Sequence, residues 1–309
     1  MKEIKNVALI GLGGIGCAYA SKIQDSMPTG LKIIADQNRI QRYKENGFII
    51  NNIPYNFQYI SPEEATEAVD LIIISVKYNQ LSTAIKDIEK FVGKDTIILS
   101  LLNGVNSEEV IGAVYGKEKL LYSLCVAVDA LRVGNIIDFT SNGRIVFGEE
   151  ENLRLSEKVS SVKSFFEKTN IAYEIPTDML HSLWWKYMVN IGINQTSAVL
   201  KATYGVFQKN SEARKFMEMA MLEVIEVSNK LGTRLTKIDL TTWYDLLNHL
   251  PAYGKTSMLQ DIEAKRKTEV DMFSGALSKL GKTCSVKTPV NDALYHIIKS
   301  MEWMNTEIS

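Results

Sequence analysis

The sequence predicts an α/β fold in which a doubly wound parallel sheet is followed by an all-helical C-terminal domain. Two observations support this prediction. In the first half of the chain, short apolar runs typical of buried strands alternate with amphipathic segments typical of helices. Beyond Pro176 the spacing of apolar residues becomes helical almost without interruption.

The length and composition of the chain limit what it can be. A chain of 309 residues exceeds the comfortable size of one hydrophobic core, so we expect two domains, residues 1–175 and 176–309. The net charge of −1 gives no electrostatic reason to expect nucleic acid or an anionic membrane as partner. The scattered cysteines Cys17, Cys125 and Cys284 favour reduced thiols in the cytoplasm over disulfides or zinc ligands, and the histidines also lack metal-ligand spacing. No metal site is therefore expected.

One N-terminal segment resembles a secretory signal peptide superficially. Lys2 and Lys5 precede an uncharged stretch over residues 6–21. That stretch contains four glycines, which make a poor apolar helix, so we do not expect it to direct secretion. No run reaches the ~18 apolar residues that a membrane span requires, and no membrane association is expected.

The strands of the sheet are expected where short apolar runs end in turn-forming residues. Residues 7–10 form the first run and lead directly into a glycine-rich turn and a helix. Residues 71–76 show no alternation of apolar and polar side chains, as expected for a parallel strand that is buried on both faces. The other expected strands are 31–35, 96–102 and 120–128, with an amphipathic helix at 80–91 and extra antiparallel strands at the sheet edge within 132–148.

The C-terminal half is expected to contain several helices. Their predicted ranges are 177–200, 211–231, a shorter helix that ends before residue 251, and one continuous helix over 257–281. Ser211 is expected to cap the second of these, and Ser257 with Gln260 matches a capping box for the last.

The glycine-rich turn after the first strand indicates a dinucleotide site of the Rossmann type. A lone G-x-G-x-x-G is weak evidence, but here Gly11, Gly13 and Gly16 follow a strand and open a helix. The first glycine permits the tight turn, the second lets the backbone approach a pyrophosphate, and the third permits close packing of helix and strand. The segment expected to bind the cofactor is Gly11, Leu12, Gly13, Gly14, Ile15 and Gly16.

The choice between NAD and NADP depends on the end of the second strand. Asp36 lies 20 residues after Gly16, where an acidic side chain accepts the ribose hydroxyls of NAD and repels the extra phosphate of NADP. Arg39 and Arg42 follow closely and offer neutralising charge to a phosphate, so NADP stays open. The balance favours NAD.

A polar stripe on the first C-terminal helix suggests a catalytic site. Lys186, Asn190 and Asn194 are spaced by four residues, which places them on one helical face among large apolar side chains. A desolvated lysine there is suited to act as general acid toward a carbonyl oxygen. Glu269 is a candidate partner for it, against the simpler interpretation of a surface charge within a basic segment.

Taken together, these residues resemble the ketopantoate reductase (2-dehydropantoate 2-reductase) family over nearly the whole chain. No single motif is decisive, but their order and spacing together are specific. The matching segments are Gly11–Gly16, Ser75-Val76-Lys77, Leu102-Asn103-Gly104-Val105, Trp185-Lys186 with Asn190 and Asn194, Ser257–Asp261, and Lys267–Asp271.

The resemblance implies reduction of ketopantoate to pantoate by hydride transfer from NAD(P)H, with a small 2-keto acid as the substrate. It implies that Lys186 is the general acid and that Glu269 orients the lysine or the substrate hydroxyl. Substrate would be held by Asn103, Asn190, Asn194 and Ser257. Lys77 and Asn103 would lie near the nicotinamide.

The sequence departs from the family pattern at two places. Asp36 stands where the family usually has an arginine for the NADP phosphate, so the resemblance implies NADPH while this residue argues for NADH. Asn135–Phe139 replaces the more typical Val-x-His-like stretch, which leaves the choice of 2-keto acid open. In addition, Ser257 and Glu269 would be ~18 Å apart on one straight helix, too far to share a small substrate unless the chain folds back.

Other functions remain as alternatives to a ketopantoate reductase. A related dehydrogenase of hydroxyacids or sugar phosphates would share the two-domain plan, but a phosphorylated substrate would require more clustered cations. A nicotinamide-sensing protein without catalysis would not need both Lys186 and Glu269. Helical domains of this kind often pair across an apolar face, so a homodimer is an alternative to a monomer.

Overall fold

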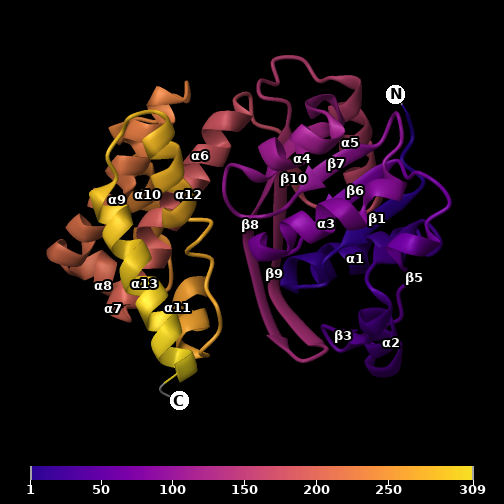
Figure 1. The fold of residues 1–309 in the computed structure, drawn as a ribbon, viewed down its shortest axis with the longest axis horizontal. Coiled ribbons are helices and arrows are strands. Elements are labelled where there is room, and N and C mark those ends of the chain that lie inside the picture. Colours follow the sequence, from indigo (N-terminus) through magenta and orange to yellow (C-terminus); the bar gives the residue numbers. More distant parts are fainter. Residues whose placement is uncertain (1, 308–309) are drawn as a thin grey trace. The chain divides into compact units, whose positions relative to one another are not determined.

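The chain divides into two compact units, residues 1–180 and 181–309. The computed structural model describes residues 2–307. The N-terminal unit is an α/β fold and the C-terminal unit is helical, which confirms the predicted fold class (Figure 1).

The strands of residues 2–307 form one mixed sheet in the order β4-β3-β9-β8-β7-β6-β1-β2-β5, with β10 paired to β9. The five neighbouring pairs from β5 to β8 are parallel, as predicted, whereas β8 with β9 and β3 with β4 are antiparallel. The strands are β1 (Val7–Ile10), β2 (Leu31–Ile34), β3 (Phe48–Ile50), β4 (Ile53–Tyr55), β5 (Tyr59–Ile60), β6 (Leu71–Ile74), β7 (Ile97–Ser100), β8 (Leu120–Val133), β9 (Ile136–Gly148) and β10 (Tyr173–Glu174).

Helices cover both faces of the parallel part of this sheet. In β1, Val7 and Leu9 belong to one hydrophobic cluster and Ala8 and Ile10 to another, so alternate side chains enter opposite cores. This explains why the strand sequences are continuously apolar. The α-helices of the unit are α1 (Gly14–Ser26), α2 (Gln37–Asn46), α3 (Leu81–Asp87), α4 (Ser107–Tyr115) and α5 (Glu157–Lys168). The helix predicted over 80–91 is shorter, because 3₁₀ turns occupy both of its ends.

Two strands extend far beyond the parallel sheet. β8 and β9 pair as a long antiparallel hairpin, which Figure 1 shows projecting past the other strands. The prediction of antiparallel strands within 132–148 is therefore confirmed, but their placement at the sheet edge is wrong. β3 and β10 both pair with β9, so β9 is an interior strand.

The helical unit contains a short π-helical turn that the sequence pattern did not predict. The segment expected as one helix over 177–200 consists of α6 (Met179–Val189), the π turn Asn190–Asn194 and α7 (Gln195–Leu200). The following helices are α8 (Tyr204–Lys209), α9 (Ser211–Lys230) and α10 (Lys237–His249). Asn210, and not Ser211, caps α9, because its side chain accepts the amide hydrogens of Glu212 and Ala213.

The prediction of one continuous helix over 257–281 is wrong. The chain forms α11 (Ser257–Glu263), then non-helical residues, then α12 (Ser274–Thr283) and α13 (Pro289–Glu307). Thr256 caps α11 by accepting the Leu259 amide at 3.2 Å, so Ser257 is the first helical residue and not the cap. The break means that Ser257 and Glu269 do not lie on one straight helix, and the ~18 Å separation expected from such a helix no longer applies.

A polar network is buried within the helical unit. Glu223 on α9 accepts hydrogen bonds from the first amides of α13 and from Asn291 Nδ2 at 2.7 Å. Asn291 Oδ1 lies 3.3 Å from Gln195 Nε2 and 2.9 Å from Ser274 Oγ. Ser274 Oγ lies 2.6 Å from Gln195 Oε1. The network thus joins α7, α9, α12 and α13, and each buried polar group in it has a partner.

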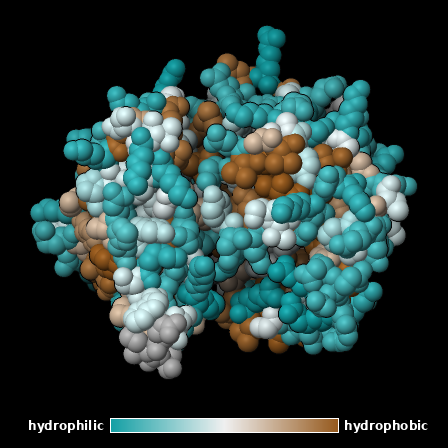
Figure 2. Space-filling view, in the orientation of Figure 1, coloured by the Kyte–Doolittle hydropathy of each residue, from teal (hydrophilic) through white to brown (hydrophobic). Residues whose placement is uncertain are grey.

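The face of the molecule in Figure 2 is mainly hydrophilic, with separate brown patches among the teal. Within residues 2–307, every helix is too short or too polar to cross a lipid bilayer.

The buried network gives a prediction for stability. Asn291→Ala removes its bonds to Glu223 and Gln195 in a site with no exposed surface, and we expect the free energy of unfolding to fall by about 2–3 kcal/mol. All four tryptophans lie in the helical unit, so denaturation followed by tryptophan fluorescence reports on that unit. The control Asn248→Ala, at an exposed position, should change stability by less than about 0.5 kcal/mol. Equal effects of the two substitutions would show that the network does not stabilise the unit.

Candidate active site

The glycine-rich turn is held in place by the carboxyl end of a neighbouring strand. Gly11 has a φ of +102°, and a Cβ there would lie 2.6 Å from the carbonyl oxygen of Ser75, so only glycine fits. Ser75, directly after β6, donates from Oγ to the Gly11 carbonyl at 2.7 Å. A Cβ on Gly16 would lie 1.9 Å from the same carbonyl, so the first turn of α1 packs directly on the loop.

Of the remaining residues of the turn, two anchor it in the core and one faces open space. Leu12 is buried and Ile15 packs against the hydrophobic core, so both side chains fix the loop. A Cβ on Gly13 would meet no atom within 4 Å, and α1 begins at the next residue, Gly14. Unobstructed backbone before a helix N-terminus is what a dinucleotide pyrophosphate requires, so the residues present fit this cofactor.

The loops that follow β6 and β7 lie next to each other beside this turn. β6 pairs with both β1 and β7 in parallel, so the carboxyl ends of these strands lie along one edge. Lys77 is exposed after β6, and Asn103 is half-buried after β7. Asn106 Nδ2 donates to the Tyr78 hydroxyl at 2.9 Å, which joins the two loops. The chain order reverses between β1 and β6, which is the point where open α/β sheets bind their ligands.

Asp36 lies just beyond the end of β2 and serves as the N-cap of α2. Its Oδ1 accepts the Arg39 amide at 2.9 Å, and its Oδ2 forms an ion pair with Arg39 Nε at 3.2 Å. The side chain is 57% exposed, so the carboxylate remains accessible from solvent while it caps the helix. Asp36 therefore has a structural role as a helix cap. Its place at the end of β2 is also the one that a ribose-binding acid occupies in Rossmann folds.

The two asparagines of the stripe predicted on the first C-terminal helix lie at the ends of the π turn. Asn194 Nδ2 donates to Asn190 Oδ1 at 3.1 Å, so the two amides lie on one face. Asn194 is 7% exposed, and Lys186 and Asn190 are half-buried. π turns occur frequently at functional sites, and here the turn carries both asparagines of the stripe.

Ser257 joins this stripe from another helix. Its hydroxyl lies 3.4 Å from Asn194 Oδ1, although the residue is exposed. The fold of the helical unit therefore places both Asn190 and Ser257 next to Asn194.

Glu269 is half-buried in the non-helical segment between α11 and α12. Its carbonyl accepts the amides of Met272 and Phe273 at 3.0 and 3.1 Å. Tyr187, the neighbour of Lys186, donates its hydroxyl to the carbonyls of the same two residues at 3.1 and 2.8 Å. The helix that carries Lys186 is thus bonded to the segment that carries Glu269.

Two groups near the candidate residues were not predicted from the sequence. Arg132 on β8 donates to the carbonyl of Leu12 in the glycine turn. Gln195 donates to the Ile191 carbonyl at 2.9 Å inside the π turn. Both contacts join residues whose pairing depends on the folded backbone, so composition and local spacing carried no signal for either.

Metal and thiol chemistry receive no support from the described part of the chain. Among residues 2–307, no three His, Cys, Asp or Glu side chains gather in a way that would hold a metal ion. Burial raises the pKa of the Cys17 thiol to about 12, so this thiol is neutral at physiological pH and is not a nucleophile.

A strand, a glycine-rich turn and a helix in this geometry are typical of nicotinamide-dependent oxidoreductases. Sequence models of the family match both units: "Ketopantoate reductase PanE/ApbA" at residues 7–152 and "Ketopantoate reductase PanE/ApbA C terminal" at residues 178–302. The chain belongs to the ketopantoate reductase family, which confirms the resemblance seen in the sequence.

Individual relatives cover nearly the full chain. The 2-dehydropantoate 2-reductase of Aquifex aeolicus (strain VF5) is 26% identical over 303 residues, which covers 96% of this chain and 97% of that protein. A dimeric ketopantoate reductase from Staphylococcus aureus has a TM-score of 0.78 at 20% identity, covering 97% of this chain and 99% of that one. D-mandelate dehydrogenase, in a structure with NADH and anilino(oxo)acetate, has a TM-score of 0.84 at 24% identity with the same coverage. At these identities the two structures show a shared fold.

The open space at Gly13 yields a prediction that separates binding from folding. Gly13 has a φ of −80°, which any residue adopts, so Gly13→Ala should leave the thermal midpoint within about 2 °C of the wild type. The added methyl group occupies the space expected for pyrophosphate, so the Kd for NADH and NADPH should rise about tenfold or more. Fluorescence titration and thermal melting measure the two effects. The control Gly16→Ala should lower both stability and affinity, and unchanged affinity in Gly13→Ala would place the dinucleotide elsewhere.

Proposed function

We propose that the protein reduces 2-dehydropantoate to (R)-pantoate with NAD(P)H, a step toward pantothenate and coenzyme A. The observation that carries this proposal is the polar set in the helical unit, in which Asn190 and Ser257 each lie within hydrogen-bond distance of Asn194. Membership of the ketopantoate reductase family and the curated 2-dehydropantoate 2-reductases among its relatives support the same substrate.

The proposed chemistry needs a proton donor as well as a hydride. When bound at the glycine turn, a reduced nicotinamide would supply the hydride for the carbonyl carbon of the 2-keto acid. Lys186, as an ammonium group, gives a proton to the carbonyl oxygen, so the keto group becomes a hydroxyl. A cation beside this oxygen also stabilises the negative charge that develops on it. Water returns the proton to Lys186 after the reaction.

The amide and hydroxyl groups are proposed to hold the substrate. Asn103, Asn190 and Asn194 offer N–H donors, and Ser257 offers an O–H, which suit the carboxylate and hydroxyl oxygens of the substrate. The bond between Asn190 and Asn194 fixes both side chains before substrate arrives, so less conformational entropy is lost on binding. Glu269 is proposed to orient Lys186 or the substrate hydroxyl, since a carboxylate accepts hydrogen bonds from either group.

For the cofactor we propose NADH as the preferred form. Asp36 is accessible at the end of β2, where its charge opposes the 2′-phosphate of NADPH. Arg39 already pairs with Asp36, so its charge is partly neutralised and less available to a phosphate. Lys77 and Asn103, on adjoining loops after β6 and β7, are proposed to lie at the nicotinamide.

The proposal also covers where the enzyme works and whether it forms a dimer. We propose that the enzyme works in the cytoplasm, because its three scattered cysteines, Cys17, Cys125 and Cys284, suit a reducing compartment. We also propose a homodimer, supported by the Staphylococcus aureus ketopantoate reductase of similar fold, which is dimeric.

The general acid yields the first functional prediction. Lys186→Ala should lower kcat for 2-dehydropantoate by about 10²–10⁴-fold, because the carbonyl oxygen then lacks its proton donor. Nicotinamide absorbance measures turnover, and fluorescence titration should show unchanged cofactor affinity. Lys201→Ala, at an exposed lysine just after α7, is the matched control and should retain activity. Wild-type protein that binds NADH tightly but does not reduce 2-dehydropantoate would overturn the substrate assignment and lead to a panel of other 2-keto acids.

The proposed preference for NADH yields a second functional prediction, in which two substitutions separate the charge of Asp36 from its role as a helix cap. Asp36→Asn keeps an oxygen that can cap α2 but removes the charge, so stability should be nearly unchanged while kcat/KM with NADPH rises about tenfold relative to NADH. Asp36→Ala removes both, and should change the cofactor ratio similarly while costing about 1 kcal/mol of stability. If the ratio stays constant in both variants, Asp36 acts only as a helix cap.

A further inference from the structure

The segment that carries Glu269 lies between α11 and α12 and is not part of either helix, and side-chain hydrogen bonds attach it to α13. Thr268 precedes Glu269, and both its amide and its hydroxyl donate to Glu302 Oε1, at 2.7 and 2.6 Å. Thr268 is 7% exposed and the Glu302 side chain is 11% exposed, so water competes little for these bonds. The residue before Glu269 is therefore held by a charged acceptor that lies 34 residues away in the sequence.

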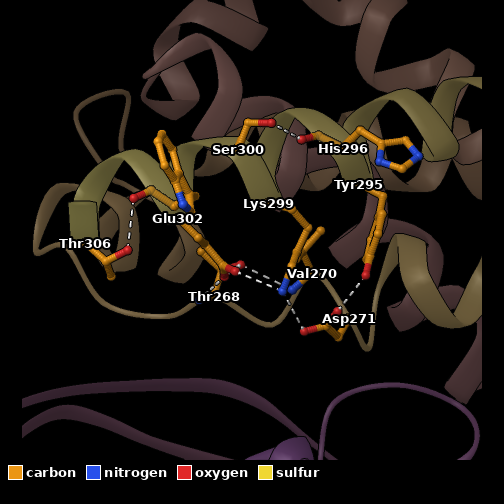
Figure 3. Close-up of polar contacts among 10 residues, drawn as sticks. Thr268, Val270, Asp271, Tyr295, His296, Lys299, Ser300, Glu302 and Thr306 are labelled. Atoms are coloured by element: carbon orange, nitrogen blue, oxygen red, sulfur yellow. Dashed lines mark hydrogen bonds and ion pairs between the residues drawn. The ribbon is translucent and has the colours of Figure 1, made fainter. Parts of the chain in front are cut away.

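The other side of Glu269 is attached to the same helix. Asp271 accepts the Tyr295 hydroxyl at 3.0 Å and lies 3.3 Å from Lys299 Nζ. Lys299 also pairs with Glu302 Oε2 at 3.2 Å, so one lysine links the two attachment points. Figure 3 shows Tyr295, Lys299 and Glu302 on one helix, with Thr268, Val270 and Asp271 on the segment below them.

The electrostatics of this cluster favour its bonded state. Desolvation opposes the charge on Lys299, but the Glu302 and Asp271 carboxylates outweigh it and raise the pKa of the lysine. The ammonium is therefore charged at neutral pH and available to both carboxylates. Val270, between the two attachment points, is fully buried, which resists rotation of the segment.

We propose that Glu302, Lys299 and Tyr295 are positioning residues that fix Glu269 by holding Thr268 and Asp271 on α13. This inference rests on the proposed function only for the role of Glu269. The three residues act through the segment, and not on the substrate. Small displacements of a catalytic group are costly, so loosening the attachment should lower turnover more than substrate affinity.

A double-mutant cycle tests the inference. Thr268→Val removes the hydroxyl donor at constant shape, and Glu269→Gln removes the group that is positioned. We expect Thr268→Val to lower kcat about tenfold with KM within about twofold, and Thr268→Ser to restore most of the activity. In the Glu269→Gln background the same change should cost less than about twofold, because nothing remains to be positioned. Equal losses in both backgrounds, or no effect of Glu269→Gln alone, would overturn the proposal.

A second measurement does not depend on the substrate. Glu302→Ala should speed hydrogen exchange of the amides of residues 268–273, whereas Ser300→Ala on the same helix should not, since Ser300 bonds only to the His296 carbonyl in Figure 3. Unchanged exchange in Glu302→Ala would show that α13 does not hold the segment. If the wild type fails to reduce 2-dehydropantoate, the proposed substrate is wrong. Hydrogen exchange still shows whether α13 holds the segment. The double-mutant cycle is then run with the 2-keto acid that the protein does reduce.

Discussion

The close approach of α1 to the end of β1 is the constraint on which the N-terminal unit depends. The Gly16 Cα lies so near the Gly11 carbonyl that no side chain fits, and Ser75 donates to the same carbonyl from the neighbouring strand. The Gly11 carbonyl oxygen, which follows β1, is thus contacted both by the first turn of α1 and by the residue after β6. Because β6 is the neighbour at which the strand order reverses, this contact also fixes where the loops carrying Lys77 and Asn103 begin. The shape of the candidate cofactor site thus follows from the packing of the glycine turn.

The helical unit must bring its candidate residues together in a different way, since a helix bundle has no sheet edge at which loops converge. Its candidate residues must project from helix surfaces in one direction over several turns. The π turn changes the helical phase locally, and Asn190 and Asn194 remain bonded to each other across it. Gln195 bonds to the Ile191 carbonyl inside this turn and to the buried network beyond it. A π turn is less stable than a regular helix, so the buried polar bonds offset a local cost at the place where the amides are needed.

The sequence predicted those features that depend on local patterns. Continuous apolar strands and the glycine turn both follow from spacing along the chain, and the structure has both. The errors occurred where tertiary contacts override spacing. Residues 257–281 have helical periodicity, but the Thr268 amide donates to Glu302, which lies 34 residues away, and nothing near Ser257 signals this contact. Asn210 similarly replaces the expected cap Ser211, because either residue type caps a helix and only the backbone direction decides between them.

In the candidate site, residue types are recognisable from the local sequence, whereas their positions depend on contacts with residues far away in the chain. Residues with the required chemistry, such as Lys186 and Glu269, are identifiable from type and context, since few side chains suit proton transfer. Their geometry depends on groups with no chemical role. Tyr187 bonds the Glu269 segment to α6, and Glu302 bonds it to α13, so the acid and its proposed partner are held by two helices that are far apart in the sequence. The break between α11 and α12 is needed for the second contact, because the Thr268 amide donates to Glu302 and not to a carbonyl four residues earlier. The proposed positioning of Glu269 thus depends on a break that the sequence pattern did not predict.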